Sequence, residues 1–374
     1  MGGPSRGAVG AALLGGALIL LAGLFDAEPL YVPGISLLVL ATLAVAWVRA
    51  AARGARVTRT VAGTRVQEGE PLLVEIEVRS GLVAVPSGEV RDALLARPAR
   101  LGLARRRTRV RIRARFARRG RRTLAPAAVL ITDPLGLAGA VVTTRGPADD
   151  VLVLPRVEPV RAPGRTGGRS AAGRSLRGAG AEADLDGLRV HRPGAPASRI
   201  AWQVYARTGE LHERNLRAGG DARPLVVLDL AGAPDADRAD AAVRPAASLG
   251  VHLAERGGGA LLLPGERRAI AIDPGLRAWP AAHARLALVA PGRRPALAAL
   301  SGRSGPVLWV SARALREPPR ALLHTTGSAR LLVVPATIAG RAARFTVAGC
   351  TGYEVGRRSR APGRARVAAP GAGT

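Results

Sequence analysis

The chain has 374 residues, which is long enough for two domains that each bury a core, together with anchoring or linking segments. A single cysteine excludes an intrachain disulfide or a cysteine-rich zinc site, and the absence of lysine excludes the phosphate-binding motif GxxxxGK[ST]. The formal net charge of +29 would ordinarily indicate nucleic acid or an anionic membrane as a partner, but the arginines are spread along an Ala-, Gly- and Pro-rich chain without a nucleic-acid motif. We therefore expect a solvated basic surface.

Two uncharged stretches open the chain, residues 8–25 and residues 30–48. At about 1.5 Å per residue the first spans roughly 27 Å of hydrocarbon, enough for one crossing. In the second, the Pro-Gly pair at 33–34 predicts a helix that begins near Ile35. A two-helix membrane hairpin over residues 1–56 accounts for both stretches. A cleaved signal peptide is the alternative, but it leaves the second stretch unexplained.

The charges around these stretches predict an orientation. The connection between them contains Asp26 and Glu28 and no arginine, whereas arginines flank both outer ends. By the positive-inside rule both ends face the cytoplasm, so we expect a plasma-membrane protein whose soluble part lies in the cytoplasm. Trp47 would suit the interfacial belt. The flanking arginines are Arg6 before the first stretch and Arg49, Arg53, Arg56 and Arg59 after the second.

Residues 57–158 predict a small β-sandwich-like module. Residues 72–78 alternate between an aliphatic face and a face with Glu75 and Glu77, and residues 109–116 repeat the alternation with arginines in place of the glutamates. If the two strands share a sheet, the arginine row can pair with the glutamate row. A nucleic-acid face is the alternative, but no aromatic residue interleaves with the arginines. Further strands are expected at 127–131 and 150–155.

Two segments predict no packed core. Residues 159–187 are expected to form a flexible linker, because residues 161–181 contain one large apolar side chain, Leu176. The linker arginines would be solvated or, near a membrane, would contact anionic lipid headgroups. Residues 351–374 are expected to form a disordered basic tail.

Residues 188–350 contain a second soluble region in which strands alternate with helices, which predicts an α/β domain with a sheet covered on both faces. The aliphatic run 225–230 is typical of a buried parallel strand. Because ligands of such folds bind at the carboxyl ends of strands, Asp229 and Ser311 lie where a site is expected. The other expected elements are helices near 235–256, 279–290 and 315–324, and strands near 260–265, 268–273, 306–312 and 329–336.

No motif assigns a reaction. The sequence has neither a GxSxG nucleophile elbow nor an HExxH metal motif. Cys350 is interpreted as a small buried apolar residue, since no partner for a nucleophile can be identified. The adjacent His212 and Glu213 are interpreted as a polar surface pair, with a general-base pair as the alternative. We therefore predict no catalytic residue, no cofactor and no metal.

Two motifs fall within this order of parts. Residues 118–137, RRGRRTLAPAAVLITDPLGL, run from an Arg-Gly turn through a strand to a DP-x-GL corner, and residues 188–211, LRVHRPGAPASRIAWQVYARTGEL, combine a Pro-Gly turn with an Arg, a Trp and an Ala-Arg pair. In these features the chain resembles the bacterial domain of unknown function 58 family. The resemblance implies an α+β multidomain protein: an N-terminal two-helix membrane hairpin, a β module and a C-terminal domain with a von Willebrand factor A-like fold.

The second motif supplies the candidate partner-binding residues. The alternative is a structural role, in which the tryptophan packs against the sheet and the arginines pair with carboxylates of the same chain. The candidates are Arg192, Gly194, Arg199, Trp202 and Arg207.

Two departures from the resembled family bear on function. Ala195 stands where the family usually has Asp, which forfeits a helix cap on the order of 1 kcal/mol. After the first core strand, Asp229 is followed by Leu-Ala-Gly-Ala, whereas metal-binding von Willebrand factor A folds have DxSxS. One carboxylate without the two hydroxyls is a poor metal site, so none is predicted.

The resemblance also implies partners, since members of the family are commonly encoded near MoxR-type ATPases and transglutaminase-like membrane proteins. We expect a membrane-anchored, cytoplasm-facing interaction or assembly factor that works with a MoxR-type ATPase and neighbouring membrane proteins and catalyses no reaction of its own. One alternative is an envelope-associated hydrolase or peptide-linking enzyme with an unrecognised site. The other is arginine-mediated binding of nucleic acid or anionic lipid.

Overall fold

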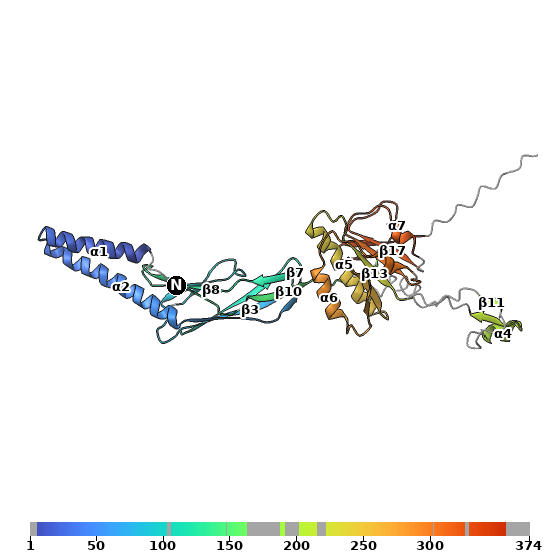
Figure 1. Cartoon of the computed structure of the whole chain (residues 1–374), viewed down its shortest axis with the longest axis horizontal. Helices are drawn as coiled ribbons and strands as arrows, with labels where there is room; N and C mark the ends of the chain where they lie inside the picture. The colour runs from blue at the N-terminus through green and yellow to red at the C-terminus, as the bar shows by residue number, and fades with distance from the viewer. Residues whose placement is uncertain are drawn as a thin grey trace, which may run out of the picture. The chain divides into compact units, whose positions relative to one another are not determined.

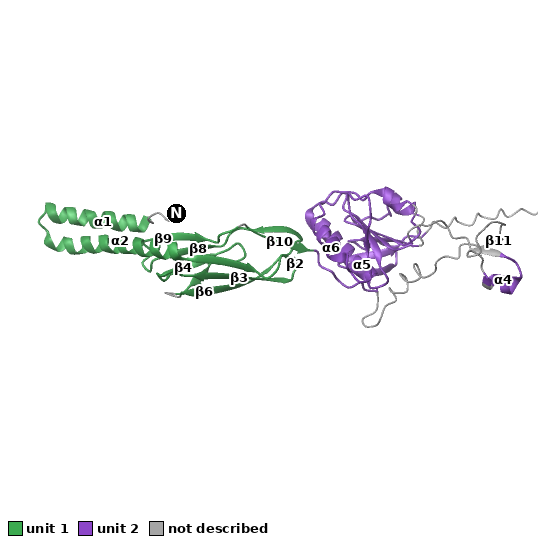
Figure 2. Ribbon diagram, turned by 60° about the horizontal axis from the view of Figure 1, so that its bottom comes forward, with its two compact units in different colours: residues 1–154 green, residues 155–374 purple. Residues whose placement is uncertain are grey.

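The computed structural model describes residues 6–102, 106–146, 148–162, 188–190, 202–214, 222–301, 303–325 and 329–356. The chain divides into two compact units, Met1–Leu154 and Pro155–Thr374 (Figures 1 and 2). The predicted α+β architecture is confirmed in outline. Two long helices come first, several small and mostly antiparallel sheets follow, and a mixed seven-stranded sheet with helices forms the second unit.

Two apolar helices open the first unit and lie side by side: α1 (Arg6–Leu24) and α2 (Tyr31–Gly54), joined by the short 3₁₀ helix η1 (Glu28–Leu30) (Figure 1). Both are long and apolar enough to cross a membrane. The predicted start of the second helix near Ile35 is wrong. The helix begins at Tyr31, because Pro33 falls in the first turn, where a backbone N–H has no intrahelical partner to lose.

The two helices come into close contact at a pair of glycines. A Cβ atom on Gly15 would lie 2.7 Å from the Gly34 carbonyl oxygen, and one on Gly34 would lie 3.0 Å from the Gly15 carbonyl oxygen. Only hydrogen atoms fit at this crossing, so the two glycines fix how the antiparallel helices are aligned along their length.

The second half of α2 belongs to the core of the β module, so packing does not divide the chain at residue 56, where the predicted hairpin ends. Ala44, Val48 and Ala51 are buried in one apolar cluster with strand residues such as Ile76 and Ile131. The Trp47 indole N–H donates to the Ala84 carbonyl at 3.4 Å. Hydropathy marks this stretch as apolar but does not distinguish a lipid contact from a protein contact.

Ten strands follow in three sheets, with the orders β1-β3-β6, β2-β10-β7 and β5-β4-β8-β9, and every pair is antiparallel except β2 with β10. The strands predicted at 72–78, 109–116, 127–131 and 150–155 are confirmed as β3, β6, β8 and β10. The bounds are β1 (Arg56–Val61), β2 (Arg65–Gln67), β3 (Pro71–Arg79), β4 (Ser87–Arg91), β5 (Ala99–Leu101), β6 (Arg107–Arg115), β7 (Gly120–Leu124), β8 (Ala128–Thr132), β9 (Gly139–Thr143) and β10 (Asp149–Leu154).

The predicted pairing of a glutamate row with an arginine row is confirmed between β3 and β6. Glu75 lies opposite Arg111 and Glu77 opposite Arg109, and Arg109 Nε lies 3.3 Å and 3.4 Å from the two carboxylates. A hydrogen bond from Arg79 lowers the pKa of Glu77 below its ordinary value. This face is therefore an ion-paired surface that is open to solvent, the first of the two interpretations given to the arginine stripe.

The second unit is built on a sheet with the order β15-β14-β13-β16-β17-β19-β18. The four strands β14, β13, β16 and β17 are parallel, and the outer pairs are antiparallel. Alternate residues face two apolar clusters, one with α5 and α6 and the other with η3 and α7, so both faces are covered as predicted. The bounds are β13 (Leu225–Asp229), α5 (Ala236–Ala254), β14 (Gly259–Leu262), β15 (Ile270–Ile272), α6 (Trp279–Leu288), η3 (Leu297–Leu300), β16 (Val307–Ser311), α7 (Arg320–Leu323), β17 (Arg330–Val334), β18 (Ala343–Val347) and β19 (Cys350–Glu354).

Three predictions for this region are corrected. The helix expected over 315–324 is reduced to α7, since prolines 318 and 319 can stand only at or before its first turn. The tail expected from residue 351 begins too early, because β19 completes the sheet and its Tyr353 is buried. The linker expected from residue 159 also begins too early, because the backbone of Arg161 exchanges two 2.8 Å hydrogen bonds with Thr346. Residues 163–187 lie outside the described residues.

A small separate element precedes β13. Strand β11 (Leu188–Val190) pairs with β12 (His212–Arg214), and the short helix α4 (Trp202–Thr208) lies between them in the sequence. Residues 191–201, between β11 and α4, lie outside the described residues.

Candidate ligand pocket at the strand ends

The predicted strand-end residues Asp229 and Ser311 are brought together between β13 and β16, where the order of successive strands in the sheet reverses. They end the adjacent parallel strands β13 and β16 and lie opposite one another in register. After β13 the chain turns to α5 on one face of the sheet, and after β16 it turns to α7 on the other. Loops that leave in opposite directions open a crevice between the two strand ends, which is where ligands bind in sheets of this kind.

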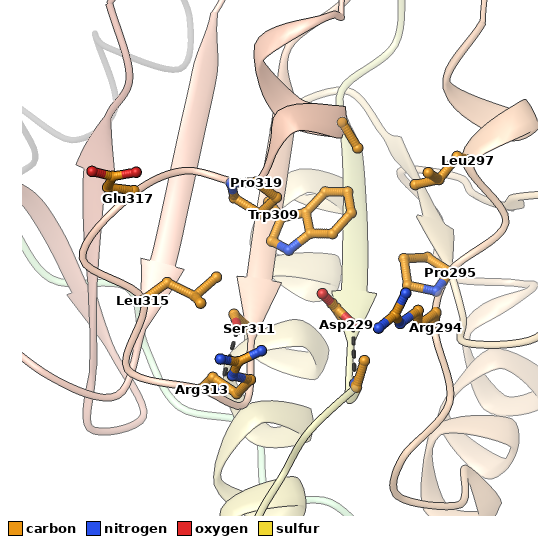
Figure 3. A pocket seen from close by; sticks show the side chains of 12 residues that line it. Asp229, Arg294, Pro295, Leu297, Trp309, Ser311, Arg313, Leu315, Glu317 and Pro319 are labelled. Carbon is orange, nitrogen blue, oxygen red and sulfur yellow. Dashed lines mark hydrogen bonds between the residues drawn. The ribbon is translucent and has the colours of Figure 1, made fainter.

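A cavity of about 330 Å³ lies in this crevice (Figure 3). One end is polar and is formed by Asp229, Ser311 and the guanidinium groups of Arg294 and Arg313. The remaining walls are mainly apolar. They are formed by Ala231, Pro295, Leu297, Trp309, Leu315, Pro319 and Ala321, with Glu317 at the edge. An apolar pocket with a few convergent polar groups is the usual form of a small binding site.

The Asp229 carboxylate is half-buried and only partly satisfied. Its Oδ1 accepts the Ala231 N–H at 3.0 Å, in the turn that leaves β13. Removal from water raises the pKa of Asp229 above its ordinary value, and the Ala231 hydrogen bond and the charges of Arg294 and Arg313 oppose this rise. Neither guanidinium lies within 4 Å in a described ion pair, so the three charged groups share the pocket without neutralising one another directly.

A buried donor points into the same space. Trp309 is 2% exposed, and its indole N–H interacts with the Asp229 carboxylate at a distance too long for a full hydrogen bond; it has no closer partner among the described residues. Figure 3 shows this nitrogen directed toward Asp229, and the weak hydrogen bond between them helps to keep the pKa of that carboxyl from rising further. A buried donor that is only weakly engaged in this way can form a better hydrogen bond with a bound acceptor.

A backbone hydrogen bond positions Arg313, and a glycine leaves room for its side chain. Its N–H donates to the Ser311 Oγ at 3.1 Å, and its side chain crosses Gly232, where a Cβ would lie 3.0 Å from the Arg313 Cδ. Gly232 has φ +67°, a conformation that glycine adopts without strain. The loop after β13 therefore leaves room for a guanidinium at the position where a larger side chain would displace it.

The donors present do not fit a divalent cation. The strand ends supply one carboxylate and one hydroxyl, the loop after β13 supplies alanines in place of hydroxyls, and two guanidinium groups lie close enough to act on Asp229. Magnesium and calcium need six or more oxygen ligands, and fixed positive charges oppose them.

The two candidate residues of the sequence motif that the structure describes do not line this pocket. Trp202 and Arg207 lie on α4, where Trp202 is 57% exposed and its ring meets Tyr205 edge to face at 6.3 Å between centroids. The other three candidates, Arg192, Gly194 and Arg199, lie outside the described residues, as does Ala195. The side chains of His212 and Glu213 are also outside them.

Sequence reasoning missed three of the polar residues of the pocket. Trp309 could have been found, because it stands two residues before Ser311 on the same strand and therefore faces the same side. Arg294 and Arg313 lie in loops among many other arginines, and nothing local distinguishes them.

Cys350 has the properties predicted for a buried apolar residue. Burial raises the pKa of its thiol to about 11, and its Sγ lies 3.8 Å from the Ala241 carbonyl oxygen. The Ser311 hydroxyl accepts a backbone N–H and has no histidine partner among the described residues. Neither side chain is arranged as an activated nucleophile.

Comparison of the sequence with known protein families gives no match, and no curated protein is recognisably similar to it.

Proposed function

We propose that the protein is a membrane-anchored interaction factor whose α/β domain binds a partner polypeptide at the pocket between β13 and β16. The observation that carries the proposal is the convergence of Asp229, Ser311, two guanidinium groups and a buried, weakly engaged indole N–H on one apolar cavity. The two apolar helices would hold this domain at the cytoplasmic face of the plasma membrane. In this proposal the β module is β-sandwich-like, the C-terminal domain is von Willebrand factor A-like and the chain is a member of the domain of unknown function 58 family.

The chemistry of the pocket favours a carboxylate from the partner, either an acidic side chain or a chain terminus. Arg294, Arg313 and the Trp309 N–H can all donate to it, and Asp229 is the one acidic group at the polar end. Because the pKa of Asp229 is raised, a second carboxylate nearby would favour its protonated form, which can itself donate a hydrogen bond. Apolar neighbours of the carboxylate would pack on Leu297 and Leu315.

The partner is proposed from the resemblance alone: a MoxR-type ATPase, together with neighbouring membrane proteins. A binding role fits the pocket better than a reaction, since no hydrogen bond joins the Ser311 hydroxyl to a histidine or a carboxylate among the described residues. The exposed Trp202 and Arg207 of α4 offer a second surface for the same partner.

Affinity purification of the full-length protein from membranes of its host, followed by mass spectrometry, tests this proposal. We expect the MoxR-type ATPase to be recovered with the wild type, lost with Arg313→Glu and retained with Arg268→Glu. Arg268 is an exposed arginine of the same domain that does not line the pocket. Hydrogen exchange on each variant verifies that the domain remains folded. Equal recovery with all three proteins would refute a role for the pocket.

A further inference from the structure

The corner between β8 and β9 is built by a buried carboxylate. Asp133 is 4% exposed, and its side chain accepts the backbone N–H groups of Leu135 and Ala138. Its carbonyl accepts the Gly136 N–H at 3.0 Å, and Gly136 has φ +71°, which closes a tight turn through Pro134. The polar group of the DPLG sequence is thus turned inward, and the surface of the corner is Pro134, Leu135 and Gly136, with Leu135 66% exposed.

This corner is attached to the first membrane helix. The Leu137 carbonyl accepts the Ala8 N–H at 2.9 Å, and the Gly136 carbonyl oxygen would lie 3.3 Å from a Cβ on Gly7. The first N–H groups of a helix have no partner within the helix, so the β module caps α1 from outside. A substantial displacement of the corner from the N-terminus of α1 would break this bond.

The level of the corner along the hairpin follows from the glycine crossing. Gly15 lies against Gly34 in antiparallel helices, and Ala8 precedes the first by as many residues as Ala41 follows the second. The corner is therefore level with about Ala41. The uncharged stretch of α2 continues beyond that level to Val48, for about 10 Å at 1.5 Å per residue.

The length of the hairpin also indicates that the corner lies at the depth of the hydrocarbon core. Beyond the level of the corner, α1 extends about 24 Å from Ala8 to Leu24, against a hydrocarbon core of about 30 Å; the shorter arm of α2, Tyr31 to Ala41, is continued by η1. A hairpin that spans the whole hydrocarbon core therefore uses its full length beyond Ala8 and reaches the level of the corner. The open face of α2 just beyond it carries Leu43, 61% exposed, and Trp47, 43% exposed, before the exposed Arg49.

We infer that the β8–β9 corner is a membrane-inserting element, with Leu135 in the lipid of the cytoplasmic leaflet beside the N-terminus of α1. The lipid surface continues from the exposed apolar face of the hairpin onto the corner, while Trp47 and Arg49 mark the headgroup layer. This inference rests on the membrane anchoring in the proposed function. It assigns to the β module a contact with lipid that hydropathy cannot reveal, because the corner is far too short to span.

A depth measurement on the full-length protein tests the inference. Single cysteines replace Leu135 or Leu82 in a Cys350→Ala background and carry an environment-sensitive fluorophore. The vesicles contain phosphatidylcholine and phosphatidylglycerol, with a lipid whose acyl chain bears a spin-label quencher. Leu82 is the matched control: it is fully exposed, and its neighbour Gly81 touches Gly54, about 20 Å farther along α2 than the level of the corner.

We expect the lipid quencher to remove most of the fluorescence at position 135 and to leave position 82 unchanged, with aqueous iodide giving the reverse pattern. If the protein floats with the vesicles but iodide quenches both positions alike, the inference is overturned while the membrane anchor stands. Equal quenching of both by lipid also overturns it, since the corner then has no preferred depth. If the protein does not float with the vesicles, the proposed anchoring itself has failed.

Discussion

Loss of the Arg59 guanidinium should strongly destabilise the first unit. It lies on β1 with its side chain 3% exposed, and its Nη1 is 3.1 Å from the Asp92 carboxylate, which is fully buried. It also donates to the Ala125 carbonyl at 2.6 Å and to the Leu124 carbonyl at 3.0 Å, and its Nε is 2.7 Å from Asp149. One side chain therefore joins strands of two small sheets to the turn that follows β4 of the third.

Replacing Arg59 with Met keeps the side-chain volume and removes the charge. Asp92 is then left buried without a counter-charge, and two backbone carbonyls lose a donor, so we expect a loss of about 3–5 kcal/mol in the free energy of unfolding. Asp149→Ala is the contrasting variant: this carboxylate is 41% exposed, and its loss should cost less than about 1 kcal/mol. Adding Asp92→Asn to Arg59→Met should recover much of the loss, because the uncompensated charge is gone while the acceptor of the Leu94 N–H is kept.

Hydrogen exchange of the full-length protein in detergent micelles measures these changes in the free energy of unfolding, with peptides from β7 and β10 as reporters. A cost of about 3–5 kcal/mol corresponds to exchange that is roughly a hundred- to a few-thousand-fold faster in Arg59→Met. Two results would refute the reasoning. One is a change in Arg59→Met no larger than in Asp149→Ala, and the other is a double variant no more stable than the single one.

Three further predictions concern other parts of the fold. Gly88→Ala should destabilise the first unit by about 1–3 kcal/mol in thermal unfolding, since its Cβ would lie 2.3 Å from the Leu130 carbonyl oxygen. Gly139→Ala in the same sheet is the control: its Cβ would meet only contacts at 3.8 Å, so this variant should be neutral or stabilising. Burial lowers the pKa of His252 from 6.5 to about 4, so the unfolded chain takes up a proton at higher pH than the folded protein does. Stability should therefore fall as the pH drops from about 6.5 toward 4, by on the order of 1–2 kcal/mol once the partial exposure of the ring is allowed for. His252→Gln should flatten that part of the stability–pH profile, and an unchanged slope would contradict the assignment. Cys350, with its pKa raised to about 11, should resist iodoacetamide near neutral pH until urea unfolds the second unit, and labelling of the native protein would show that its burial is wrong.

The candidate site was only partly predictable. The aliphatic run before Asp229 identifies a buried parallel strand, and the rule that ligands bind at strand ends points to Asp229 and Ser311. The rest depends on which loops meet above the sheet. Arg294 and Arg313 are far from Asp229 in the sequence and resemble many other arginines, so only the fold selects them.

Local periodicity in the sequence was sufficient to predict several features of the protein. The two apolar helices, the paired Glu and Arg rows of β3 and β6, and the alternation of strands and helices after residue 225 all depend on side-chain spacing, because helices and strands present their faces at fixed intervals.

Features that join distant segments depended instead on tertiary packing. Packing placed the second half of α2 in a protein core and set the β8–β9 corner against α1. Packing also buried Arg59 between the small sheets, although the position of this residue just after the hairpin resembles that of a flanking charge. It also added β18 and β19 to the sheet. The physical reason is common to all of these. Hydropathy and charge describe the surroundings that a side chain needs, whereas the partner that provides them is chosen only when the chain packs.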